Sequence, residues 1–274
     1  KDSSEGKEMS KVLSVTQAFM LIAPMLAPVL GAIILKVADW KMTFIVLAIL
    51  TGVSLVGAFL LQETLPVKER TQSSTIQTIL GLRKVAKNPN FSSLLLVGAL
   101  IAAPFMAYLA LASYIYIDGF GVSETTFSMY FALNAGASIL GPVMYMRFGA
   151  GSVKKVISAG IMVAIISAVL ILTIGNASPI IFLVSYVLYS IMTSYFRPLI
   201  SDLLLSSTKT DVGATSSVMN FVFTVIGSIG MVVGSLQWSS YTGGLGITML
   251  IFIALTTAVW FYLLKARSIQ FDWK

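Results

Sequence analysis

The chain has 274 residues, of which 57% are hydrophobic and only 11% are charged, with 18 Lys and Arg against 11 Asp and Glu. Its mean hydropathy is +0.91, and because soluble domains carry about 25% charged residues, this composition excludes an ordinary water-soluble fold. The sequence contains no His and no Cys, which excludes disulfides, imidazole or thiol catalysis and metal sites of the Cys/His type.

Eight apolar segments are each long enough to cross a hydrocarbon core of about 30 Å, which takes about 20 helical residues. Short polar or Gly-containing connections separate most of them, as is typical of antiparallel neighbouring helices. The sequence therefore predicts an all-α polytopic membrane protein. In chain order, the predicted spans are Val12–Leu35, Thr43–Leu61, Phe91–Ile117, Thr126–Met146, Val156–Gly175, Pro179–Leu203, Ala214–Leu236 and Leu245–Leu264.

One long polar connection, residues 62–90, follows the second span. Ile76, Ile79 and Leu80 have helical spacing within it, and basic residues follow them. Such a segment predicts an amphipathic helix at the cytoplasmic interface, with its cations facing anionic headgroups. We therefore expect four parts: residues 1–61 with two spans, the central cytoplasmic loop 62–90, a six-helix part 91–264 and a cytoplasmic tail 265–274.

The positive residues fall almost entirely on alternate connections, and such positive loops stay in the cytoplasm. This pattern predicts that both termini of the chain are cytoplasmic. Because the cations are spread over several loops, no nucleic-acid partner is expected. The 15 of 18 cations on this side are Lys1, Lys7, Lys11, Lys68, Arg70, Arg83, Lys84, Lys87, Arg147, Lys154, Lys155, Lys209, Lys265, Arg267 and Lys274.

Arg197 and Asp202 are the ionisable residues that fall inside a predicted span. Both lie toward its cytoplasmic end, because Arg197 is about 27 Å along a helix that begins at Pro179. They can be an interfacial anchor and a polar helix terminus, or part of a cytoplasmic gate or polar substrate path. Pro198 favours a kink beside them, which suits a helix that bends to open a cavity.

Uncharged polar and aromatic side chains inside the spans are candidates for a substrate cavity. Aromatic faces bind flat or cationic molecules, and flexible Met adapts its shape to several ligands. Hydrogen bonding between helices is the alternative role of each polar residue. The candidates are Gln17, Phe105, Tyr108, Phe131, Asn134, Tyr189 and Asn220, with Met106, Tyr186, Thr193 and Tyr195 nearby.

The first predicted span is rich in small residues and contains two prolines, which allow helices to pack closely. The positions concerned are Ser14, Ala23, Ala27, Pro28, Gly31 and Ala32. Ala18–Leu35 resembles the antiporter motif in the fifth helix of major facilitator drug:proton antiporters, Gly-x8-Gly-x3-Gly-Pro-x2-Gly-Gly. Pro28 and Gly31 match this motif, and Ser or Ala stands in place of its other glycines.

Further segments are similar to the Bcr/CflA branch of that superfamily. They are Trp40 with Thr43–Phe44, the sequence Glu63–Pro66 and the stretch Gly213–Asn220, with a weaker basic loop at Arg147, Gly149, Lys154 and Lys155. The resemblance implies a partial major facilitator fold, with this chain as helices five to twelve of twelve and the first four absent. The acidic residue that carries the proton would then belong to the absent helices.

The resemblance implies a transporter of the inner membrane that moves amphipathic drugs or related small molecules outward against protons by alternating access. It needs the lipid bilayer, its substrate and protons as partners, and no cofactor or metal. A truncated, non-transporting membrane protein or scaffold is an alternative, and a sugar or amino acid exporter of the same superfamily is another. A membrane enzyme is not expected, because the spans offer neither paired carboxylates nor a metal-binding set.

Overall fold

The computed structural model describes residues 27, 30–31, 33–60, 87–149, 151–207 and 212–266, and every regular element among them is helical. Within these residues, seven segments are helical, long and apolar enough to cross a membrane. The prediction of an all-α polytopic membrane protein is confirmed.

The helices agree with the second to the eighth predicted span to within a few residues at each end. The described helical elements are α2 (Trp40–Leu60), α4 (Pro89–Ser113), η2 (Tyr114–Gly119), α5 (Glu124–Ser138), α6 (Leu140–Phe148), α7 (Val153–Thr173), α8 (Pro179–Ser207), α9 (Val212–Gly234) and α10 (Tyr241–Ala266). Most of the first predicted span and the whole predicted interfacial helix lie outside the described residues.

Two of the helices begin with a polar residue followed by proline. The Asn88 side chain accepts hydrogen bonds from the backbone N–H groups of Asn90 and Phe91, at 3.1 and 3.4 Å. At the start of α8, the Ser178 hydroxyl accepts one from the Ile181 N–H at 3.2 Å. These side chains satisfy amide groups that have no partner within the helix, and the proline supplies a preset backbone angle.

The predicted span Thr126–Met146 is divided into α5 and α6 by a turn at Ile139. Pro142 explains the division, because a proline has no N–H to donate to the carbonyl four residues earlier, which here belongs to Ser138. In the turn, the Ile139 N–H donates instead to the Gly136 carbonyl at 3.2 Å. The predicted span is therefore correct in its limits but is not one continuous α-helix.

The predicted span Phe91–Ile117 also changes its winding before it ends. From Tyr114 to Gly119 the helix widens to η2, a π-helical turn. There the Phe120 N–H donates to the Ile115 carbonyl, five residues earlier, at 3.1 Å. Such wide turns are rare and often lie at functional sites in helices.

The chain forms two compact units, which are described separately. The first combines residues 1–73 with 124–135, and the second combines residues 74–123 with 136–274. In the first unit, no residue of α2 is buried. In the same unit, Phe131 and Asn134 of α5 are buried, and the Phe131 ring meets the Phe127 ring at 5.7 Å.

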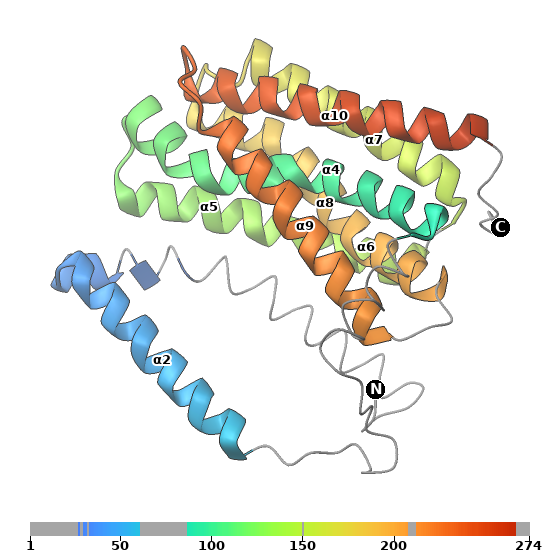
Figure 1. The fold of residues 1–274 in the computed structure, drawn as a ribbon. Helices are drawn as coiled ribbons and strands as arrows, with labels where there is room; N and C mark the ends of the chain where they lie inside the picture. The colour runs from blue at the N-terminus through green and yellow to red at the C-terminus, as the bar shows by residue number, and fades with distance from the viewer. Residues whose placement is uncertain are drawn as a thin grey trace. The chain divides into compact units, whose positions relative to one another are not determined.

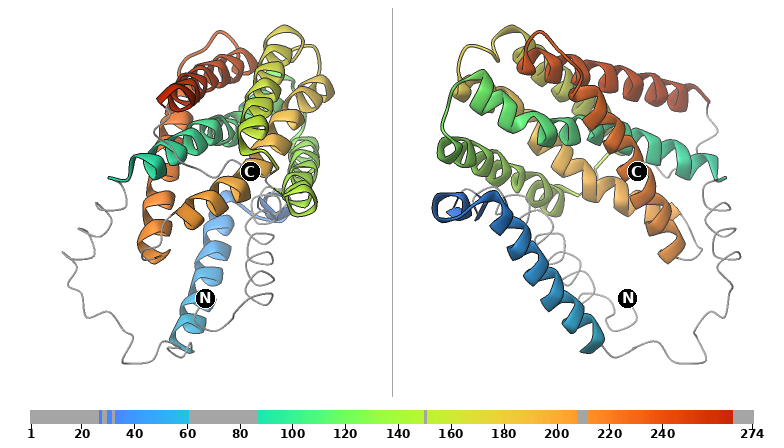
Figure 2. Two further views of the ribbon diagram at one scale, coloured as in Figure 1. Left: turned by 90° about the vertical axis from the view of Figure 1, so that its right-hand side faces the viewer. Right: turned by 60° about the vertical axis from the view of Figure 1, so that its left-hand side comes forward.

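The second unit is built around α4 (Figures 1 and 2). This helix packs most extensively against α9, which crosses it, and also against α8 and α10. On the outside, α7 packs against α8 and α10, and α6 packs against α8. Leu100 and Ala103 of α4 and Phe252 of α10 form a buried apolar cluster. This core packs α4 against α9 and α10.

Glycines allow the closest helix contacts in this unit. A Cβ added at Gly230 of α9 would lie 2.5 Å from the Ala103 carbonyl oxygen, and one at Gly227 would lie 2.9 Å from the Met106 side chain. Gly234 meets Ala107 of α4 in the same way. Small residues at this spacing let two membrane helices approach through their backbones. One face of α9 is therefore fixed against α4.

Candidate functional site

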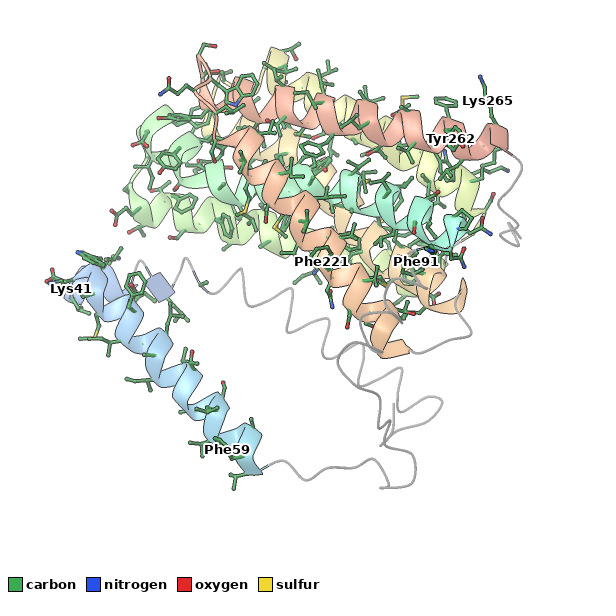
Figure 3. All side chains as sticks on the ribbon, in the orientation of Figure 1. Lys41, Phe59, Phe91, Phe221, Tyr262 and Lys265 are labelled. Atoms are coloured by element: carbon green, nitrogen blue, oxygen red, sulfur yellow. The ribbon has the colours of Figure 1, made fainter. Side chains whose placement is uncertain are left out.

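The remaining surface of α9 separates into a polar and an apolar arc. At roughly 100° per residue, each arc spans about 80° of the helix circumference. The polar arc consists of the exposed residues Ser217, Asn220, Thr224 and Ser228, and the exposed Met231 lies on the same side of the helix, about one turn beyond Ser228. The apolar arc consists of Phe221, Val225, Ile229 and Val232, with exposed fractions of 69%, 42%, 50% and 65%. Phe221 is labelled on α9 in Figure 3.

The two arcs suit different surroundings. Large apolar side chains are stable in contact with lipid, whereas an exposed polar group in hydrocarbon has no water with which to form hydrogen bonds. Two hydroxyls of the polar arc are satisfied by their own helix, because Ser217 donates to the Gly213 carbonyl at 2.9 Å and Ser228 to the Thr224 carbonyl at 2.8 Å.

Asn220 is different, because its primary amide offers two donors and a carbonyl acceptor. No hydrogen bond joins it to another group in the described part of the chain. Within the described part of the chain, this amide is left for water or for a polar group of a ligand. The sequence singled out Asn220 but missed the arc around it, although hydroxyl residues three and four apart are a visible helical pattern.

Tyr108, another predicted cavity residue, belongs to a buried aromatic cluster between α4 and α8. Its ring stacks on Tyr186 with centroids 4.0 Å apart and an angle of 23° between the planes. Phe182 lies parallel to Tyr186 at 6.2 Å, and Tyr116 meets Phe182 edge-on at 5.4 Å. Offset and edge-on contacts of this kind are favourable between aromatic rings. They fix η2 and α4 against the first half of α8.

Tyr189 is also fully buried, one turn further along α8. Its hydroxyl donates to the backbone carbonyl of Ile101 on α4. Phe105, the remaining predicted cavity residue of α4, is partly exposed. Phe131 and Asn134 belong to the other unit, and Gln17 lies outside the described residues. Tyr108 and Tyr189 are thus the predicted cavity residues that share one interface in the second unit.

The predicted gate residues lie on the same helix but have different surroundings. Arg197 is exposed, and no ion pair joins it to Asp202 in the described structure. Asp202 instead accepts a hydrogen bond from the Tyr145 hydroxyl of α6, at 2.8 Å. Tyr145 and Tyr195 pack edge-on at 5.7 Å. An exposed guanidinium inside a span requires water or an anionic partner.

A second tyrosine contact joins the same two helices. The Tyr195 hydroxyl donates to the carbonyl of Gly149, directly after α6, at 2.7 Å. Gly149 has a positive φ of 65°, which favours glycine at the end of a helix. Gly141 adds close packing, because a Cβ there would lie 2.5 Å from the Tyr195 backbone nitrogen. The Asp202 end of α8 is thereby attached to α6.

Of the residues proposed to form the antiporter motif, Ala27 and Gly31 are described, and both are helical. Outside the backbone next to Gly31, no atom of the described residues lies within 4 Å of the position that a Cβ there would occupy. Ala23, Pro28 and Ala32 lie outside the described residues.

Comparison with known proteins identifies relatives along most of the chain. YdgK of Bacillus subtilis (strain 168), called an uncharacterized MFS-type transporter, is 32% identical over 178 residues, which cover 63% of this chain and 44% of YdgK. The multidrug resistance protein MdtM of Escherichia coli O157:H7 is 24% identical over 239 residues, 85% of this chain and 58% of MdtM. The multidrug transporter MdfA of Edwardsiella piscicida is 26% identical over 244 residues, 86% of this chain and 59% of MdfA.

The chain therefore spans about half the length of these relatives. A family profile described as the Major Facilitator Superfamily matches residues 1–231. This match covers all of the predicted first span, the polar arc of α9 and every described helix between them. Together with the helical architecture, it shows that the chain belongs to the Major Facilitator Superfamily of membrane transporters.

Proposed function

We propose that this protein exports amphipathic organic molecules, drugs among them, across the bacterial inner membrane by alternating access, with protons moving inward in exchange. It would belong to the Bcr/CflA branch, with both termini of the chain in the cytoplasm. Residues 91–264 would form one six-helix half, residues 1–61 part of the other half, and residues 62–90 the connection. Several relatives are named as multidrug resistance proteins or multidrug transporters, which supports this substrate class.

The observation that carries the proposal is the polar arc of α9, defined above as Ser217, Asn220, Thr224 and Ser228. It lies beside an apolar arc on a helix whose third face is fixed to α4. A helix that bordered only lipid and protein would need no exposed polar face. A polar arc along a span is expected where the helix borders a path that admits water or an amphipathic ligand.

The arrangement suits a substrate with both polar and apolar parts. The Asn220 amide can donate to or accept from its polar group, while the apolar rim beside it contacts the hydrocarbon part. Arg197, exposed inside its span, would favour anionic groups or water near its end of the path.

Proton coupling would need a carboxyl group that meets the path within the membrane. The carboxylates of the described residues are Asp39, Asp118, Glu124 and Asp202, and each lies near the end of a helical segment. The resemblance to drug:proton antiporters assigns the proton carrier to first-half helices outside this chain. Proton entry is therefore proposed from that resemblance and from the multidrug relatives.

Efflux measurements with variants of the polar arc test this function. We expect Asn220→Leu to lower the efflux rate of a fluorescent lipophilic cation such as ethidium about fivefold, the effect of one lost hydrogen bond. Thr224→Val, which keeps the shape of the side chain, should also slow efflux. Thr173→Val is the matched control, because Thr173 is exposed at the end of α7 and its hydroxyl donates to its own helix at 2.7 Å.

Collapse of the proton gradient should abolish efflux by the unmodified protein. If all variants and the control export the dye at the same rate, the polar arc does not line the path. If the correctly inserted protein exports none of a panel of amphipathic cations, the drug export proposal is wrong, and the scaffold alternative gains support.

A further inference from the structure

Pro104 lies in the interior of α4 and is buried. A proline at this position removes the hydrogen bond to the carbonyl four residues earlier, which is that of Leu100, and its ring pushes against the same carbonyl. In membrane helices such an interruption is tolerated where neighbouring helices supply polar groups to the loosened backbone. The neighbours of α4 near Pro104 therefore decide how freely this helix can bend.

One neighbour supplies such a group. The hydroxyl of Tyr189, on α8, donates to the carbonyl of Ile101, the residue directly after Leu100. Tyr189 is 0% exposed and Ile101 is 2% exposed, so water does not compete for this bond. A carbonyl oxygen has two lone pairs and can accept from Tyr189 in addition to its own helix.

A second neighbour lies on the other side of the same turn. Gly230 of α9 approaches the carbonyl of Ala103, and Ala103 is about 200° around α4 from Ile101. The weakened turn of α4 is thus held between a hydroxyl of α8 and the glycine face of α9. The polar arc lies on the same helix as that glycine face. Because α9 packs against α4 through this face, a bend of α4 at Pro104 shifts α9 and its polar arc.

We propose that Tyr189 is a positioning residue: its hydroxyl fixes the backbone of α4 beside Pro104 and thereby limits how far α4 bends and where α9 stands. The consequence for transport rests on the proposed function, whereas the effect on the shape of α4 does not. Tyr189 then acts through the backbone of α4 and not as a ligand for the substrate.

Spin labelling can test this inference, because this chain contains no Cys that would be labelled as well. Ser93→Cys and Ser113→Cys place spin labels on α4 before and after Pro104, at partly exposed positions about 30 Å apart. In the complete protein in lipid nanodiscs, the distance distribution between these labels reports the bend of α4. We expect Tyr189→Phe to broaden the distribution and shift its centre.

Two further variants make the result specific. Tyr186→Phe is the matched control, because Tyr186 is equally buried on α8 and its ring stacks on Tyr108 of α4, but its hydroxyl makes no hydrogen bond to α4. It should leave the distribution unchanged. Pro104→Ala returns an N–H to the Leu100 carbonyl, so in that background Tyr189→Phe should have no further effect.

Transport measurements then distinguish a positioning role of Tyr189 from a loss of folding in the variant. We expect Tyr189→Phe to lower the maximal export rate about fivefold, as one net hydrogen bond predicts, with an unchanged KM. A changed distribution without any export by the unmodified protein would support the role in α4 and contradict the proposed function. An unchanged distribution in Tyr189→Phe, or effects of Tyr189→Phe and Pro104→Ala that simply add, would overturn the inference.

Discussion

Several polar side chains in this protein form hydrogen bonds to a neighbouring helix. Ser167 of α7 donates to the Ser185 carbonyl of α8 at 2.6 Å, and Trp260 of α10 donates to the Ser158 hydroxyl of α7 at 3.1 Å. The first bond explains why Ser167 is buried in a protein of such high hydropathy, and the second gives the buried Trp260 indole N–H an acceptor. In a membrane, a buried hydroxyl without a partner would be costly.

The bond from Tyr145 to Asp202 gives a prediction at this scale. As a single hydrogen bond between two helices, it should stabilise the folded protein by about 1 kcal/mol. In a double-mutant cycle, Tyr145→Phe and Asp202→Ala should therefore be less than additive in their effect on thermal unfolding in detergent. The cycle of Asp202→Ala with Tyr241→Phe is the control, because Tyr241 stacks on Tyr114 instead and does not contact Asp202. Equal additivity in both cycles would show that the hydrogen bond contributes nothing.

Residue types were easier to predict than their surroundings. The sequence alone identified Tyr108, Tyr189 and Asn220 as polar residues within spans. It could not show that Tyr108 and Tyr189 are core residues between α4 and α8 while Asn220 is exposed. Position along a span is a property of the sequence, whereas the direction of a side chain depends on which helix lies beside it.

Whole helices differ in how tightly they are held, and glycine contacts mark the difference. Gly141 of α6 approaches the backbone of α8, where neither the Tyr195 nitrogen nor the Ile191 carbonyl can move aside. Apart from the backbone of α2 itself, no described atom lies within 4 Å of the position of a Cβ added at Gly52. The same residue type therefore has opposite roles in the two helices.

A pair of substitutions tests this difference. Gly141→Ala should destabilise the protein by about 1–3 kcal/mol, because an added methyl group overpacks the contact of α6 with α8. Gly52→Ala should stabilise its helix by about 0.5–1 kcal/mol, because alanine favours a helix more than glycine does. Thermal unfolding of the purified variants measures both effects. A stable Gly141→Ala protein with normal unfolding would contradict the close contact.

The ends of the helices could be predicted from hydropathy, but the breaks inside two of the predicted spans could not. The start of α8 at Pro179 agrees with the prediction because Ser178 and Pro179 form a recognisable helix start. The break at Ile139 and the wide turn η2 lie inside apolar stretches, where hydropathy gives no sign of them. Pro142 was a usable signal for the first, and no residue pattern indicated the second.

At the scale of the whole molecule, composition and the length of the apolar segments established a polytopic helical membrane protein, because runs of about 20 apolar residues cross lipid as helices. The superfamily followed from short motifs and was shown by comparison. Transport by the proposed mechanism requires that α9 borders a water-accessible path.

The most direct test of that central claim is the reactivity of single cysteines along α9 in the membrane. The chain contains no Cys, so each variant gives one signal, and thiols react as thiolates, which require water. We predict that cysteines at Ser217, Asn220, Thr224 and Ser228 react with a hydrophilic methanethiosulfonate reagent and are protected by ethidium. Cysteines at Phe221, Val225, Ile229 and Val232 should stay unreactive. Equal reactivity of both arcs, or no reaction along the polar arc, would contradict the account.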